Sequence, residues 1–63
     1  MKTVVDLRQL LKQYGSFIYT RDRKLDLQLM LEEVKELYQY GMISIEEYQK
    51  AVLVIRHEEQ LIQ

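Results

Sequence analysis

The sequence predicts an all-α fold: a compact three-helix bundle that forms one domain over residues 1–63. Three observations lead to this prediction. Apolar residues recur at three- and four-residue spacing, which is the period of a helix. Proline is absent, and the only two glycines, Gly15 and Gly41, separate the periodic segments. Capping residues stand before the first and last segments. We therefore expect helices near residues 3–14, 22–40 and 45–61.

The first segment reads "TVVDLRQLLKQYG". Thr3 can cap the helix together with Asp6, three residues later, in the pattern of a capping box. Gly15 is suited to the left-handed conformation that ends many helices. The helix should turn one apolar stripe inward, and its members are Val4, Leu7, Leu10, Leu11 and Tyr14.

The second segment contains "LDLQLML", which alternates with period two and would by itself suit a strand. The following "EEVKELYQY" is rich in strong helix formers, so we predict one helix that ends at Gly41. Its main face comprises Leu27, Met30, Val34 and Leu37, and further leucines cover other faces. A helix that is apolar on several sides should lie at the centre and contact both neighbours.

The third segment opens with the clearest cap, because Ser44 and Glu47 have capping-box spacing. Ala51 is small enough to allow another helix to approach closely. We expect Met42 or Ile43 to pack against the first turn. The predicted inward stripe comprises Ile45, Tyr48, Val52, Ile55 and Ile62.

Composition restricts the class of protein. A chain of 63 residues buries only about 60% of the surface of its unfolded form, so its stability is small. No cysteine is present, which excludes disulfides and thiolate metal sites. At 48% apolar residues, the chain should fold. No secretory signal or apolar run of about 20 residues occurs, so we expect a cytoplasmic protein with no membrane segment.

The usual parts of a catalytic site are missing from the sequence. His57 is the one histidine, and no carboxylate stands four residues from it. Ser16 and Ser44 lie in no nucleophile motif, and no glycine-rich phosphate loop occurs. Adjacent glutamates point to different helix faces. We therefore expect a protein that is not an enzyme and that binds neither a metal nor another cofactor.

Charge is distributed unevenly along the chain. Residues 1–31 carry a net charge of +3 and residues 32–63 a net charge of −4. The stretch "FIYTRDRK", residues 17–24, places three cations at a helix start, where they oppose the helix macrodipole. A bound phosphate would relieve that conflict, because helix-start amides and guanidinium groups bind anions.

Aromatic rings accompany these cations, and the pairing of rings with cations is the usual chemistry of single-stranded DNA or RNA binding. Arg8 and Lys12 share a face of the first helix and add to the charge. The overall net charge of −1 is unlike that of most dedicated nucleic-acid binders. The predicted phosphate- and nucleic-acid-binding residues are Arg21, Arg23, Lys24, Tyr19, Tyr14, Arg8 and Lys12.

Two other interpretations remain open. In the first, Phe17 and Ile18 anchor the connection to the core. Asp22 and Asp26 then neutralise Arg23 and Lys24, and the acidic third helix pairs with Arg21. In the second, the protein is an interaction module or a homo-oligomer. Its surface would comprise Tyr38, Tyr40, Met42 and Tyr48 around the second turn, together with Leu25, Leu29, Leu31 and Val54 as apolar residues in excess of the core.

The segment "LLKQYGSFIYTRDRKLDLQLMLEEVKELYQYGMIS", followed by "EEYQKAVLVIRHEE", resembles the YqgQ-like family of small uncharacterised bacterial proteins. The match covers nearly the whole chain, and its most specific parts are "YG-x-x-IYTRDRKLD" and "ELY". The resemblance implies a compact three-helix fold with no known catalytic activity, and it suggests single-stranded nucleic-acid binding. A lesser similarity, confined to "LYQYGMISIEEYQKA", is to a short helical oligomerisation module.

Overall fold

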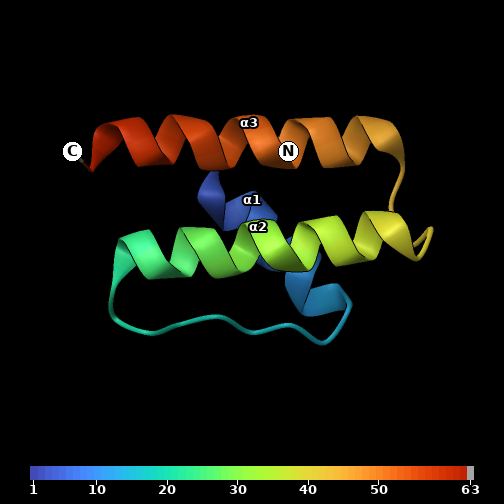
Figure 1. The fold of residues 1–63 in the computed structure, drawn as a ribbon, viewed down its shortest axis with the longest axis horizontal. Helices are drawn as coiled ribbons and strands as arrows, with labels where there is room; N and C mark the ends of the chain where they lie inside the picture. Colours follow the sequence, from blue (N-terminus) through green and yellow to red (C-terminus); the bar gives the residue numbers. More distant parts are fainter. Residues whose placement is uncertain (63) are drawn as a thin grey trace.

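The computed structural model describes residues 1–62 and contains three helices, α1 (Val4–Gln13), α2 (Arg23–Gln39) and α3 (Ile45–Leu61). No strand occurs in these 62 residues. α2 and α3 run antiparallel, and α1 crosses behind them and contacts both (Figure 1). The all-α three-helix bundle is therefore confirmed, and each predicted helix boundary lies within one residue of the observed one.

The predicted helix starts are confirmed at α1 and α3. The Thr3 hydroxyl accepts a hydrogen bond from the Asp6 amide at 3.3 Å, and the Asp6 carboxylate accepts one from the Thr3 amide. At α3 the Ser44 hydroxyl accepts from the Glu47 amide, and the Glu47 carboxylate accepts from the Ser44 amide, both at 3.1 Å. Each capping box satisfies two backbone donors that would otherwise lack a partner inside the helix.

Both glycines end a helix in the left-handed conformation, with φ of +85° at Gly15 and +72° at Gly41. After each glycine, the next amide turns back to the carbonyl five residues earlier. The Ser16 amide bonds to the Leu11 carbonyl at 2.9 Å, and the Met42 amide bonds to the Leu37 carbonyl at 2.8 Å. This is the Schellman motif, which explains why the chain reverses sharply at both points.

The core takes the predicted face of α2 and, apart from the exposed Tyr14, that of α1. The predicted stripe of α3 is correct for Ile55, which is buried, and for Tyr48, which packs against the core. Ile45 and Ile62 are 46% and 42% exposed, so their predicted inward positions are wrong. Val54, expected to be in excess of the core, is buried. The small Ala51 lies at the centre of the α3 contact, so the residues three and four positions later flank it inward. The core comprises Val4, Leu7, Leu11, Leu27, Met30, Val34, Leu37, Ile43, Ala51, Val54 and Ile55.

Tyr38 and Tyr48 stack across α2 and α3, with ring centroids 4.7 Å apart. Within residues 1–62, no helix has the length and apolar character needed to cross a membrane.

Candidate nucleic-acid interface

Residues 14–22, which we call the connector, join α1 to α2 along the outside of the bundle (Figure 1). The side chains of Ser16, Ile18 and Thr20 turn toward the bundle. The Ser16 hydroxyl donates to Glu33 at 2.7 Å, and Ile18 packs against the core. Because side chains of an extended chain alternate between two sides, Phe17 and Tyr19 turn outward. Arg21, at the end of the connector, is exposed as well.

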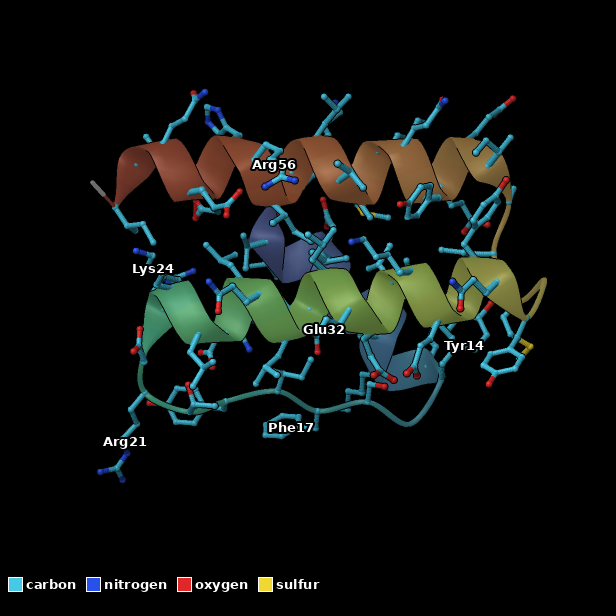
Figure 2. All side chains as sticks on the ribbon, viewed as in Figure 1. Tyr14, Phe17, Arg21, Lys24, Glu32 and Arg56 are labelled. Carbon is cyan, nitrogen blue, oxygen red and sulfur yellow. The ribbon has the colours of Figure 1, made fainter. Side chains whose placement is uncertain are left out.

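The outward side chains form a row of two aromatic rings and one cation. Phe17 is 81% exposed and Tyr19 is 65% exposed. Figure 2 shows Phe17 and Arg21 along the outer edge of the connector, with Arg21 pointing away from the bundle. The expectation that Phe17 anchors the connector is therefore wrong, because the inward position belongs to Ile18. Phe17 is absent from the predicted binding residues, because the short alternation in "SFIYTR" is too weak a pattern to place its side chain outward.

A buried carboxylate holds the connector in place. Asp26 of α2 is only 3% exposed, and it accepts hydrogen bonds from the Thr20 amide at 2.8 Å and the Thr20 hydroxyl at 2.6 Å. Arg8 of α1 lies 3.5 Å from the same carboxylate and donates to the Ile18 carbonyl at 2.6 Å. The Thr20 hydrogen bonds, assisted by the charge of Arg8, hold the pKa of Asp26 below its usual value. Three segments therefore meet at this carboxylate.

This arrangement corrects the pairings expected near the start of α2. Asp26 pairs with Arg8 rather than with Arg23 or Lys24, and α3 reaches Arg23 rather than Arg21. The Arg23 guanidinium lies 3.8 Å from the Glu58 carboxylate. Asp22 caps α2, and its side chain accepts from the amides of the second and third helical residues at 3.0 and 3.3 Å. Those two amides already have an acceptor, so they are not available to an anion while Asp22 caps the helix.

Three predicted cations remain without a carboxylate within 4.0 Å in the described part of the chain: Lys12, Arg21 and Lys24. All three are exposed. Lys24 points toward the end of α3, away from the connector (Figure 2). Arg21 belongs to the aromatic row of Phe17, Tyr19 and Arg21, and Lys12 lines a hollow beside Phe17.

Two adjacent hollows flank the connector and share Arg8. The first has a volume of about 140 Å³ and is mainly apolar, with Lys12 among its lining residues. The second has a volume of about 310 Å³ and is basic. The first is lined by Val5, Arg8, Gln9, Leu11, Lys12, Ser16, Phe17, Ile18 and Met30, and the second by Arg8, Tyr19, Arg21, Arg23 and Asp26.

The structure brings together most of the predicted site residues but not all of them. Arg8, Tyr19, Arg21 and Arg23 line the basic hollow, and Lys12 lines the apolar one. Tyr14 lies beside the turn between α2 and α3 (Figure 2), where its hydroxyl donates to the Met42 carbonyl at 3.0 Å. Tyr14 therefore ties two turns together at a distance from the row. No cluster of histidine, aspartate and glutamate in residues 1–62 is arranged to hold a metal ion.

Comparison with known proteins agrees with the resemblance in the sequence. A Bacillus subtilis (strain 168) protein with the name "Uncharacterized protein YqgQ" is 45% identical over 58 residues. The aligned region covers 92% of this chain and 82% of that protein. Residues 1–61 match the family described as YqgQ-like. The capped three-helix bundle with the "IYTRDRK" connector is thus a member of the YqgQ-like family.

Proposed function

We propose that this protein binds single-stranded nucleic acid along the outer face of the connector, without catalysis. The observation that carries the proposal is the exposed row of Phe17, Tyr19 and Arg21. Neither ring contributes to the core, and both lie beside cations at the surface. Stacking of unpaired bases on such rings stabilises a complex by about 1–3 kcal/mol per base.

Electrostatics supports binding of modest strength. Lys12 and Arg21 have no carboxylate partner in residues 1–62, so their charges can attract phosphates. Arg8 and Arg23 are already paired with Asp26 and Glu58, and their contribution is reduced accordingly. With few available cations and a net charge of −1, we expect dissociation constants in the micromolar range or weaker.

Titration of fluorescent single-stranded oligonucleotides at several salt concentrations, with a duplex of equal length as control, tests the proposal. Each phosphate neutralised on a single strand contributes about −0.7 to the salt slope of the binding constant. Replacing Lys12 and Arg21 together by alanine should therefore flatten the slope by about 1.4 units.

The matched control variant is Lys24→Ala with Lys35→Ala. It removes the same charge from exposed positions on α2, and Lys24 points away from the connector (Figure 2). It should keep the slope of the native protein. Absence of binding to single strands, or equal slopes in the two variants, would refute the proposed interface.

Self-association is a second candidate function, and the outer surface of α3 favours it. Leu53 is 68% exposed and, with Tyr48, Gln49 and Val52, lines an apolar hollow of about 400 Å³. α1 lies behind the α2–α3 pair, so no third helix covers the front of the pair (Figure 1). The proposed occupant is a second copy of this chain.

Sedimentation equilibrium at high micromolar concentration tests self-association. We expect a dimer that Leu53→Glu converts to a monomer, because the substitution places a charge in an apolar contact. A native protein that stays monomeric at this concentration would refute this second candidate.

A further inference from the structure

We infer that the apolar hollow between α1 and the connector receives one pyrimidine base of the bound strand. This inference rests on the proposed function and adds base selectivity to it. The hollow would distinguish single-ring bases from purines, whereas the aromatic row alone would stack on any base.

The hollow is open to solvent on one side, and the space inside it matches one six-membered ring. Its volume is about 140 Å³. An apolar cavity of about 150 Å³ in another protein holds one benzene molecule. A pyrimidine ring is of similar size, whereas the fused rings of a purine need more space. The hollow is also well below the roughly 300 Å³ at which pockets for larger ligands begin.

The lining is suited to a flat ring with one polar edge. Leu11 and Met30 are fully buried at the inner side, and Phe17 supplies an aromatic wall. Gln9, on the exposed side of α1, carries an amide that both donates and accepts hydrogen bonds. An unstacked base is recognised in this way, by contact with its faces and hydrogen bonds to its Watson–Crick edge.

Charged and aromatic residues beside the hollow can contact the nucleotides on either side of the inserted base. Lys12 lines the hollow and can meet the phosphate beside the inserted base. The basic hollow begins at the shared Arg8 and includes Tyr19 and Arg21. Tyr19 follows Phe17 by two residues, about 6.6 Å along an extended chain, so it can stack the next base. The charge complementarity to phosphate favours a nucleotide over an uncharged aromatic ligand.

The experiment uses three 12-residue single strands with equal numbers of phosphates. One consists of abasic sites throughout, one carries a single central thymidine and one a single central adenosine. Fluorescence anisotropy measures their affinity for the native protein. We expect adenosine, which can stack only on the aromatic row, to raise affinity about 5-fold over the abasic strand. Thymidine, which can also enter the hollow, should raise it roughly 30-fold.

A filling variant tests whether the hollow causes this difference. Val5 lines the hollow and is exposed, so Val5→Phe should fill it without disturbing the core. The thymidine-to-adenosine ratio should then fall to about 1, with the salt slope unchanged. Leu61→Phe, at a similarly exposed apolar position on α3, should keep the native ratio. If Val5→Phe loses helicity by circular dichroism, Gln9→Phe at the exposed side of the hollow repeats the test.

The outcomes separate the two proposals. Equal binding of the thymidine and adenosine strands, both tighter than the abasic strand and salt-dependent, would overturn the pyrimidine site and leave the proposed function standing. A thymidine preference that survives Val5→Phe and Gln9→Phe would also overturn the site, because the selectivity would arise elsewhere. Failure to bind natural single strands of mixed sequence would overturn both proposals.

Discussion

At the scale of single residues, Arg21 has the least expected conformation in the chain. Its φ is +69°, and it is the only residue other than glycine with a positive φ among residues 1–62. The left-handed conformation costs an L-residue with a side chain roughly 1–2 kcal/mol. Arg21 is exposed and has no carboxylate partner in the described residues, so packing does not explain its identity. Strain retained at an exposed arginine is what a binding role would explain.

Arg21→Gly should therefore separate stability from binding. Glycine adopts a positive φ without strain, although it also adds entropy to the unfolded chain, so the free energy of unfolding should stay equal or rise by up to about 1 kcal/mol. Oligonucleotide binding should weaken, with the salt slope flatter by about 0.7 units. Urea denaturation and the titration measure both. Arg21→Lys should keep the native slope, and a glycine variant that binds like the native protein would contradict a role for this charge.

Asp26 is a second residue of interest, because its lowered pKa predicts a measurable change at acid pH. Hydrogen bonds from Thr20 and the charge of Arg8 lower its pKa in the folded protein. The stability that the ionised group contributes is therefore fully present above the ordinary aspartate pKa of about 3.9. It is lost as the pH falls through the lower folded pKa. The Thr20 amide resonance should shift in that acid range as the connector is released.

Asp26→Asn provides the control for this acid transition. The asparagine oxygen can still accept a hydrogen bond from Thr20, but the side chain does not titrate. The Thr20 resonance of the variant should therefore stay constant over the range in which the native resonance moves. A native Thr20 resonance that moves with a midpoint above 3.9 would show that the carboxylate is not stabilised in its charged form.

At the scale of the elements, the sequence predicts the helix ends better than the helix faces. Caps and terminal glycines are local, so Thr3, Ser44, Gly15 and Gly41 could be identified from spacing alone. The face of α3 depends on how closely Ala51 lets the other helices approach, which is a tertiary effect. The prediction therefore includes Ile45 wrongly and misses Val54.

The connector was the hardest element to predict. Its inward and outward sides are fixed by contacts between distant residues, above all Arg8 with the Ile18 carbonyl and Thr20 with Asp26. A six-residue alternation with no regular secondary structure gives too weak a pattern to assign those sides. The position of the candidate cations beside aromatic rings and a helix start follows from the sequence. Only the structure shows which of them have no carboxylate partner within the described residues.

Gly41 allows a direct test of how a helix end is specified. A Cβ added there would meet nothing within 4 Å, so substitution costs conformation only. Gly41→Ala should lower the free energy of unfolding by about 1–2 kcal/mol, because φ is +72°. Chemical synthesis of a chain this short also allows D-alanine at the same position, which favours positive φ and should stabilise the protein relative to L-alanine. Equal free energies of unfolding for the L-alanine and D-alanine proteins would show that position 41 does not require a positive φ.

At the scale of the whole molecule, the proposed interface and the core use largely different parts of the chain, although Leu11 and Met30 of the core also line the apolar hollow. The core comes from the helices and Ile43, whereas the proposed interface lies mainly on the connector. The described part of the chain extends over 32 × 20 × 17 Å, and the connector runs along one edge of it (Figure 1). Asp26 and Arg8 join the two parts, because they fix the connector without being part of its outer row.

Because of this separation, one variant should change binding and leave stability nearly unchanged, and a second variant at a neighbouring position should lower stability without weakening binding. Replacing Arg21 and Arg23 by alanine should flatten the salt slope by about 0.7–1.4 units, depending on whether Arg23 leaves Glu58 to meet a phosphate. The stability should change little. The exposed Arg23–Glu58 pair contributes at most about 1 kcal/mol, and removing cations near a helix start offsets that loss.

Asp22→Ala should do the reverse. It removes the side chain that accepts from the Lys24 and Leu25 amides, so the free energy of unfolding should fall by about 1 kcal/mol. Binding should be equal or tighter, because a negative charge beside the phosphate path is lost and two amides become available to an anion. Thermal or urea unfolding together with oligonucleotide titration measures both variants. The opposite result would be a large loss of stability in the Arg21/Arg23 variant together with no binding of single strands by the native protein. These arginines would then have a structural role, because their removal would change the free energy of unfolding and no binding.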